Sequence, residues 1–467
     1  MNAPPILVCV PAFRGAEVIG ETLRAIARQQ VPGLVCHISV DGGDAGTAEA
    51  CRPFLADPRF RLTVQDRRLG WAGNLNALWA EARDGYAMYW QQDDLADDRY
   101  LDRLLAAAEA APWASVTYAD VQWFGARSER EELPSVTGFA LDRAVRMAEA
   151  QHYLPFRGLV RAGALRAAGL LRITPFDSAL EDLVQVARFA RVGEMLRVPG
   201  PIYLKRAHRA AVHGEHLRKP AAIRRGAARL YAAGMLAAAW PAAHGTDGPR
   251  VARRLLPRWL RAAPGRWLHY DPAAENAADA PRFACEVLRE AAAACGVPSG
   301  VALLGPWAFD EADPDQALLA EALRREAWRG AFRARVARDG GGSVSAGEAD
   351  ALLSSGWSLP EAWGVWTDGP DAMLDLPLPE GRWRVELDVR AFPPAARPRV
   401  TVTQDGALLA EARLAAQDGL AFVAEAGADG ARIALALPDA TSPAALGLGD
   451  DARALSLGLV SVGVARG

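Results

Sequence analysis

Residues 86–103 read YAMYWQQDDLADDRYLDR, and this stretch decides the expected fold. An apolar run from Tyr86 to Trp90 ends at two adjacent carboxylates, Asp93 and Asp94, and a helical pattern follows from about Asp98. Two carboxylates at the tip of a buried strand are costly unless a cation meets them. A hard divalent ion, which prefers carboxylate oxygens and often binds phosphate as well, would meet this need. The alternative is a plain strand-to-helix turn with Asp98 as the N-cap.

The residues before this stretch repeat the same alternation of a short strand and a helix. Strands are predicted at 6–10, 35–41, 61–65 and 86–90, with helices at 16–29, 47–56 and 74–82. Units of this length predict an α/β fold, a mainly parallel sheet with helices on both faces. Ligands of such sheets bind at the carboxyl ends of the strands. Residues 11–13, Asp41 and Asp93 all fall at the carboxyl ends of predicted strands, and therefore indicate a ligand site.

The composition and the predicted secondary structure change in the second half of the chain. Residues 216–338 are rich in Ala, Leu and Arg and predict several helices, including one at 314–338, and DGGGSVSAG (339–347) is typical of a flexible linker. Beyond it, short alternating runs at 383–392, 399–414, 420–426 and 431–438 predict an antiparallel β-sandwich. The expected domains are thus 1–215, 216–338 and 348–467. Three tryptophans of the last domain are either core residues or a surface for stacking on sugar: Trp357, Trp363 and Trp366.

Composition excludes several classes of protein. The 467 residues are 51% hydrophobic and 23% charged, which is ordinary for globular domains. No apolar run is long enough for a transmembrane helix, and the N-terminus lacks the basic start of a signal peptide. The five cysteines have no CxxC spacing, so we expect buried thiols in a reducing compartment and neither a disulfide framework nor a zinc site.

Charge is concentrated in one band. Residues 216–266 carry 11 basic side chains and one acid, Asp247. With Trp240, Trp259 and Trp267 interspersed, the band is compatible with peripheral membrane contact through 216–267 or with a solvated helical scaffold. No recognised nucleic-acid module accompanies it, so we do not expect nucleic acid as a partner.

Five motifs in order carry a family resemblance. PAFRGAEVIGETLRAIARQ, VDGG, RRLGWAGNLNAL, QQDDLADDRYLDRLL and ALEDLVQVARFARVGEMLRVPGPIYLKRAHRAAVHG together resemble glycosyltransferase family 2, over about residues 5–215. These enzymes have a GT-A fold and use nucleotide-activated sugars. The resemblance implies an enzyme that moves a sugar from a nucleotide-sugar donor, with UDP-linked donors expected first, to a glycan or lipid-linked acceptor in cell-envelope or capsular polysaccharide synthesis. It also implies a cytoplasmic or inner-membrane-peripheral location.

The resemblance assigns roles residue by residue. The implied nucleotide-sugar-binding residues are Pro11, Ala12, Phe13, Glu17 at the start of the first helix, Asp41, Arg68, Gly70, Asn74, Asn76, Asp93 and Arg206. From the residues alone, Asp41 is also compatible with a turn, and Asn74 and Asn76 with helix caps. Asp182 is the implied catalytic base, with Glu181 positioning it or the acceptor. From the residues alone, a carboxylate pair at a helix start is commonly just complementation of the helix dipole.

The metal motif departs from the family pattern. Many relatives have Asp-x-Asp-Asp where this chain reads Gln91-Gln92-Asp93-Asp94. Asp93 as ligand, Asp94 in support and His208 remain the expected site for Mn²⁺ or Mg²⁺, and Lys205 and Arg206 would neutralise the departing diphosphate. The amide at 91 also motivates an alternative, a catalytically degenerate scaffold whose C-terminal sandwich binds glycan. A nucleotidyltransferase fits poorly, because PAFRGAEV is not a phosphate-binding loop.

Overall fold

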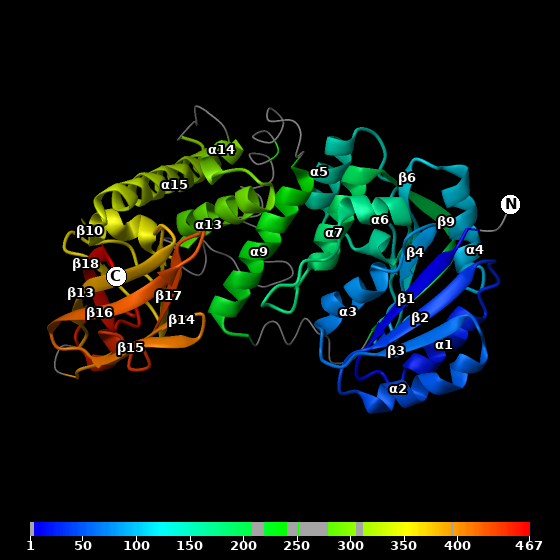
Figure 1. The fold of residues 1–467 in the computed structure, drawn as a ribbon, viewed down its shortest axis with the longest axis horizontal. Coiled ribbons are helices and arrows are strands. Elements are labelled where there is room, and N and C mark those ends of the chain that lie inside the picture. Colours follow the sequence, from blue (N-terminus) through cyan, green and yellow to red (C-terminus); the bar gives the residue numbers. More distant parts are fainter. Residues whose placement is uncertain (1–3, 208–218, 241–250, 252–278, 305–311, 394–395) are drawn as a thin grey trace. The chain divides into compact units, whose positions relative to one another are not determined.

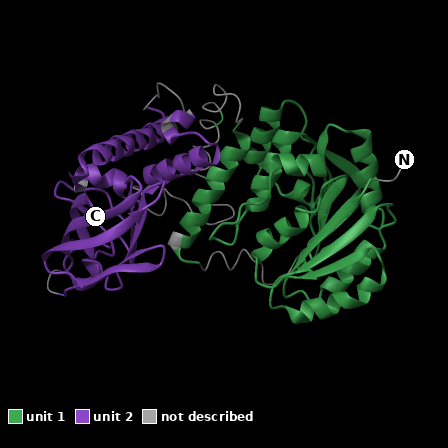
Figure 2. Cartoon of the chain, in the orientation of Figure 1, with its two compact units in different colours: residues 1–255, 267–269 green, residues 256–266, 270–467 purple. Residues whose placement is uncertain are grey.

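The computed structural model describes all residues except 1–3, 208–218, 241–250, 252–278, 305–311 and 394–395 (Figure 1). The chain divides into two compact units (Figure 2). The first is made mainly of residues up to 255 and the second mainly of residues from 270 onward. The first unit therefore extends past the boundary at 215 that the sequence suggests.

The first unit is built on one mixed sheet. Its parallel half has the order β3-β2-β1-β4, formed by β1 (Ile6–Ala12), β2 (Leu34–Val40), β3 (Phe60–Val64) and β4 (Tyr86–Tyr89). These are the four strands that the sequence predicts. The order continues through β8 (Leu159–Arg161), β6 (Ala114–Gly125), β9 (Glu194–Ala207) and β5 (Leu95–Ala96), with β7 (Arg130–Glu131) on β6. In this half β6 and β9 are parallel, whereas β8 is antiparallel to both of its neighbours.

Helices cover both faces of this sheet, as expected for an α/β fold. α1 (Ile19–Ala27) and α2 (Ala45–Cys51) lie on one face, and α3 (Gly70–Trp79) lies on the other (Figure 1). The remaining helices of the unit are α4 (Tyr100–Ala110), α5 (Ala140–Ala150), α6 (Ala162–Ala168), α7 (Glu181–Val192) and α9 (Ala221–Ala239), with 3₁₀ turns η1 (Arg52–Ala56) and η2 (Leu154–Arg157).

Two expected helix starts are wrong. Asp98 is not an N-cap: α4 has Arg99 at that position, and the Asp98 carboxylate instead accepts from Nε of Arg28 at 2.7 Å. Glu17 does not begin α1. The carbonyl of Gly15 accepts from the amides of Val18 and Ile19, which closes a turn before the helix starts.

Part of the basic band forms α9. This helix packs against α5 and α7, and its residues Tyr231, Met235 and Leu236 are buried, as is Trp240 just after it. Trp259 and Trp267 lie outside the described residues. No helix in the described part of the chain combines the length and apolarity needed to cross a bilayer. Membrane contact through 216–267 stays a prediction.

The second unit begins with helices and ends in two antiparallel sheets. Its helices are α13 (Asp279–Ala294), α14 (Gly300–Leu304) and α15 (Pro314–Asp339), the last matching the predicted helix at 314–338. One sheet has the order β10-β18-β13-β16 with β11 on β18, and the other has the order β12-β17-β14-β15. The strands are β10 (Gly341–Ser345), β11 (Val365–Trp366), β12 (Asp371–Leu376), β13 (Gly381–Ala391), β14 (Arg399–Gln404), β15 (Ala407–Arg413), β16 (Gln417–Ala426), β17 (Ala431–Ala436) and β18 (Leu457–Arg466).

Both sheets contribute to one core, which confirms the predicted sandwich. Val385 and Val462 of one sheet and Leu374 and Ile433 of the other belong to the same buried cluster. Trp357 is fully buried in it, whereas Trp363 and Trp366 are half-buried. The expected linker at 339–347 is ordered chain, because β10 pairs with β18 and α16 (Ala346–Ala349) follows directly, before η3 (Asp350–Leu352); a last 3₁₀ turn, η4, spans Ala444–Leu446.

Candidate active site

Three predicted segments meet at one edge of the sheet. In the parallel register Ala12 lies beside Val40, and Cys9 lies beside Tyr89. The residues after these strands, 13, 41 and 91–94, therefore leave the sheet at the same end. This is the edge at which α/β sheets bind ligands.

Gln92 joins two of these segments. Its side-chain oxygen accepts from the Phe13 amide at 2.8 Å, and its Nε2 donates to the Phe13 carbonyl at 2.9 Å. On the ring of Phe13 lies the guanidinium of Arg68, 3.4 Å from the ring centroid. Arg68 is exposed and Phe13 half-buried, so this cation–π pair lies at the rim of the site. Glu17 is exposed nearby, in the turn before α1.

Asp41 organises the start of α3. Its carboxylate is only 2% exposed and accepts from the amides of Leu69 at 2.6 Å, Gly70 at 3.0 Å and Gly42 at 3.2 Å. Two backbone donors at the start of α3, Leu69 and Gly70, are satisfied in this way, which explains why α3 begins at Gly70, four residues before the predicted start. These hydrogen bonds to backbone amides are those of a turn residue, the alternative that the sequence left open for Asp41.

Two asparagines on α3 are also engaged within the chain. Asn74 is buried, accepts from Ser39 Oγ at 2.5 Å and donates to the Ser39 carbonyl at 2.8 Å. Asn76 donates to the Leu171 carbonyl at 2.8 Å and accepts from the Leu171 amide at 3.0 Å. Neither is a helix cap. Asn74 ties α3 to β2, and Asn76 ties α3 to the segment that precedes α7.

The two carboxylates after β4 have different surroundings. Asp94 is fully buried; its Oδ1 accepts from the Arg206 amide at 2.9 Å, and its Oδ2 lies 3.9 Å from Nε of Arg157. Burial raises the pKa of the Asp94 carboxyl, and Lys205 and Arg157 oppose that rise. Asp93 is 6% exposed, and its carbonyl accepts from Nε of Arg206 at 3.0 Å. Asp94 thus faces the protein's own cations, which leaves Asp93 as the stronger candidate for a metal ligand.

Arg157 is the functional candidate that the sequence pattern missed. It lies at the end of η2, 5% exposed, and its Nη2 donates to the side-chain oxygen of Gln91 at 2.7 Å. Its Nη1 is buried without a hydrogen-bond partner in the part of the chain that the structure describes. Nothing in YLPFRGLV marks an arginine as functional, because the contact to residue 91 joins positions 66 apart.

Lys205 completes a pair of cations beside Gln91. Its Nζ lies 3.4 Å from the Gln91 oxygen and over the rings of Trp123 and Tyr153. Burial and the nearby Arg157 lower the pKa of Lys205, while Asp94, Asp93 and Asp182 act in the opposite direction. Asp182 therefore belongs to the same electrostatic cluster, although it comes from α7. Buried cations next to carboxylates at a strand edge are a frequent mark of a functional site.

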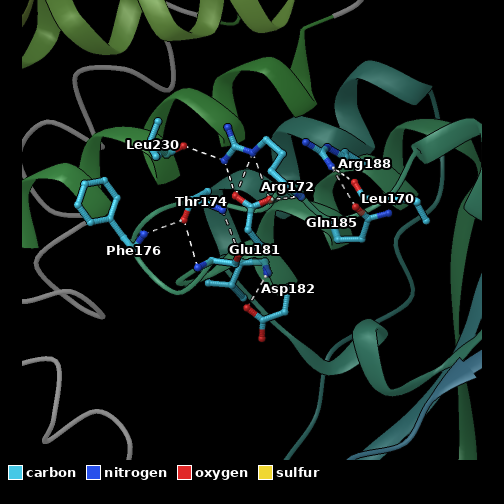
Figure 3. A network of polar contacts seen from close by, with 11 residues as sticks. Leu170, Arg172, Thr174, Phe176, Glu181, Asp182, Gln185, Arg188 and Leu230 are labelled. Atoms are coloured by element: carbon cyan, nitrogen blue, oxygen red, sulfur yellow. Dashed lines mark hydrogen bonds and ion pairs between the residues drawn. The ribbon is translucent and has the colours of Figure 1, made fainter. Parts of the chain in front are cut away.

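The expected catalytic pair opens α7, and its two members differ. Glu181 is 1% exposed and lies in an ion pair with Arg172 (Figure 3). Asp182 is half-buried, and its Oδ1 accepts from the Leu183 amide at 3.0 Å. Only Asp182 is open enough to meet a substrate.

The described residues do not assemble a complete metal site. No three His, Cys, Asp or Glu side chains within the described ranges converge on one point. His208 lies outside those ranges. The residues fit a divalent ion only if Asp93 is its main protein ligand and other oxygens complete the shell, an arrangement common for Mg²⁺.

The chain has one family match. Residues 7–167 match the family described as Glycosyl transferase family 2. The match covers nearly all of β1, the strands β2 to β4, Asp41 and the 91–94 turn, and ends before Glu181, Asp182 and the whole of β9, including Lys205 and Arg206. No curated protein sequence matches the chain significantly.

Several solved structures are distantly similar. S. aureus TarS 1-349 in complex with UDP has 13% identity and a TM-score of 0.46, covering 70% of this chain and 92% of that chain. S. aureus TarS has 11% identity and a TM-score of 0.43, covering 93% and 72%. The mannosyltransferase PcManGT from Pyrobaculum calidifontis, in complex with GDP-Man and Mn²⁺, has 18% identity and a TM-score of 0.39, covering 70% and 88%.

Proposed function

We propose that this chain, a glycosyltransferase whose residues 7–167 form a family 2 glycosyl transferase domain, moves a sugar from a nucleotide-sugar donor to a hydroxyl group of a glycan or lipid-linked acceptor. The observation that carries the proposal is the cluster of Asp93, Arg157 and Lys205 at the carboxyl edge of the parallel strands, with Asp182 of α7 within electrostatic range of Lys205. Sugar transfer needs groups of both signs of charge at this edge of the sheet. An anionic base takes the proton of the acceptor hydroxyl, and cations stabilise the leaving diphosphate.

In the proposed step Asp182 takes the proton of the acceptor hydroxyl. The hydroxyl oxygen forms a bond to the anomeric carbon while the bond from that carbon to the diphosphate oxygen breaks. The electron pair of the broken bond leaves with the nucleoside diphosphate. A single displacement from the opposite face inverts the anomeric configuration. Asp182 suits the base role because it is half-buried at a helix start, whereas Glu181 is enclosed by Arg172.

Arg157 and Lys205 are placed to stabilise the negative charge of the leaving nucleoside diphosphate. Nη2 of Arg157 and Nζ of Lys205 lie beside the neutral amide of Gln91, so neither charge is neutralised by residue 91. Nη1 of Arg157 has no hydrogen-bond partner among the described residues. Fixed cations stabilise a developing negative charge without reorganisation during the reaction. Arg206 is a tether in this arrangement, since its guanidinium is held by Glu21 at 2.6 Å and by the Asp93 carbonyl.

A divalent cation would add Lewis-acid stabilisation of the diphosphate, with Asp93 as its protein ligand. The proposal also includes a UDP-linked donor, hexose transfer, a cell-envelope or capsular glycan as product, and placement at the inner face of the cell membrane, all of which rest on the motif resemblance. The nucleotide roles of Pro11, Phe13, Arg68 and Gly70 are proposed on the same ground.

The test combines binding and turnover. Calorimetry with UDP, GDP, CDP and dTDP, each with Mn²⁺ and with EDTA, measures donor class and metal dependence in wild type and Asp93→Ala. We expect Asp182→Asn to slow transfer by about 10²–10⁴-fold with nucleotide affinity retained. Asp142→Asn, in the first turn of α5, is the matched control and should change neither quantity.

Two results would overturn the proposal. Full turnover in Asp182→Asn would remove Asp182 as the base. Absence of nucleotide binding under all conditions would favour the degenerate scaffold, especially if the full chain retained glycan binding. That alternative is favoured by one observation, the amide of Gln91 in place of a carboxylate.

A further inference from the structure

The segment 169–180, which leads into α7, has an unusual backbone. Asp177, Ser178 and Leu180 have positive φ angles of 57°, 50° and 62°. Each such residue costs about 1–2 kcal/mol unless its surroundings hold it in place. Inside the segment, Thr174 Oγ1 accepts from the Ser178 amide at 3.1 Å. From α3, Nε1 of Trp71 donates to the Asp177 carbonyl at 2.9 Å. The start of α7 is therefore set by a loop that needs external support.

Glu181 supplies part of that support from within. Arg172 Nε donates to both carboxylate oxygens of Glu181, at 3.0 and 3.2 Å, and the Arg172 amide donates to Oε2 at 3.3 Å (Figure 3). A further bond comes from Nη2. With its side chain buried and both oxygens occupied by one arginine, Glu181 has little capacity left for a substrate hydroxyl.

Helix α9 supplies the support from outside. The Leu230 carbonyl accepts from Nη2 of Arg172 at 2.8 Å (Figure 3). Two glycines four residues to either side of Leu230 leave room for the loop: a Cβ on Gly226 would overlap the Phe176 ring, and one on Gly234 would overlap the Arg172 guanidinium. Positions 226, 230 and 234 share one helix face, so α9 presents a fitted surface to the loop.

We infer that Arg172, Glu181 and α9 together are the positioning device for Asp182. Glu181 is a positioning residue and does not contact the substrate. The ion pair fixes the first turn of α7 against α9, and the next residue, Asp182, is thereby held within electrostatic range of Lys205. The inference rests on the proposed role of Asp182 as the base. It gives α9, which lies outside the family match, a part in the reaction.

The test uses three variants of the full chain. Glu181→Gln removes the charge at constant size, Arg172→Lys keeps the charge without the planar fork, and Gly234→Ala displaces the guanidinium from α9. Gly330→Ala is the control, since a Cβ at this helical glycine would meet nothing within 4 Å. For each variant, kcat, the acceptor KM and the donor affinity are measured. The value of kcat is calculated from the concentration of protein that binds nucleotide, so that unfolded protein does not lower it.

We expect kcat to fall about 10–100-fold in Glu181→Gln and Gly234→Ala, with donor affinity and acceptor KM within two-fold of wild type, because a shift near 1 Å in a reacting group costs on that scale. Arg172→Lys should retain intermediate activity. A raised acceptor KM with unchanged kcat would instead make Glu181 a substrate ligand. Lower thermal stability with wild-type kcat would make the pair merely structural. Either result overturns the inference.

A crystal structure of Glu181→Gln separates this inference from the proposed function. An Asp182 carboxylate displaced from its wild-type position supports the positioning role of Glu181, even if wild type turns over no nucleotide sugar. An Asp182 that stays in place overturns it, whatever the activity.

Discussion

The side-chain oxygen of Gln91 accepts a hydrogen bond of 2.7 Å from Nη2 of Arg157. Gln91 stands where many members of the family have a carboxylate, and Arg157 lies 66 positions away on η2. A carboxylate at position 91 would form an ion pair with this arginine. The amide satisfies one N–H of Arg157 without adding a second carboxylate to Asp94, which already faces Arg157 and Lys205, so the two cations keep charge for another anion.

Gln91→Glu should therefore weaken metal-free binding of a nucleoside diphosphate. The new carboxylate would neutralise Arg157 and Lys205, which lie within 3.4 Å of the present oxygen. We expect affinity in EDTA to fall about ten-fold, equivalent to about 1.4 kcal/mol. Calorimetry with UDP in EDTA measures this, with Gln417→Glu on the exposed start of β16 as control. Unchanged affinity in EDTA would show that these two cations do not face the diphosphate.

Asn76→Ala tests whether an asparagine of α3 acts on the nucleotide or on the fold. The Asn76 side chain forms hydrogen bonds with the amide and the carbonyl of Leu171. Loss of both bonds should lower the free energy of unfolding by about 1–3 kcal/mol. Nucleotide affinity should stay within two-fold. Denaturant unfolding and calorimetry on the same preparation measure the two effects. A ten-fold loss of affinity at unchanged stability would support the nucleotide role that the motif implies.

Gly42→Ala should disturb the turn after β2. A Cβ on Gly42 would lie 2.7 Å from the backbone Cα of Arg67, which cannot move aside as a flexible side chain can. We expect a loss of about 1–3 kcal/mol and weaker nucleotide binding, because the turn carries Asp41 and its bonds to the start of α3. Gly419→Ala, where a Cβ meets nothing within 4 Å, is the control. Wild-type stability in Gly42→Ala would show that the strand ends tolerate displacement.

Asp375→Asn should destabilise the second unit in a pH-dependent way. Burial alone would raise the pKa of this carboxyl, but Arg329, Arg289 and Arg432 hold it well below its ordinary value. Breaking such a buried pair costs about 3–5 kcal/mol. Because the folded-state pKa is lowered, the stabilisation is complete above the unfolded pKa of about 3.9 and is lost as pH falls through the folded value.

Thermal unfolding of the full chain at pH 7 and at pH 3 checks this sign. Wild type and Asp375→Asn should differ strongly at pH 7 and less at pH 3. Asp439→Asn is the control, because its ion pair with Arg399 is on the surface. A difference that grows toward low pH would contradict the assignment.

Much of the first unit was predictable from local pattern. The four parallel strands appear at the predicted places because each is a short apolar run bounded by turn residues, and such runs need no distant partner to be recognised. The helix at 314–338 and the strands of the sandwich were predictable for the same reason. The strand β10 within 339–347 was not predictable, because its glycines are as common in flexible linkers as they are acceptable in a strand. Only its pairing with β18 makes this segment a strand.

Residue type and spacing along the chain predict the order of the first four strands and the helices between them, the family motifs, and the carboxylates at residues 93 and 94. Which polar groups meet depends on how distant segments pack in the fold. Arg157 reaches Gln91 across 66 positions, and Leu230 of α9 reaches Arg172 across 58. The structure likewise separates Glu181 from Asp182, neighbours in sequence, into an enclosed ion pair and an accessible carboxylate. Burial and pairing are properties of three-dimensional packing, and no local pattern contains them.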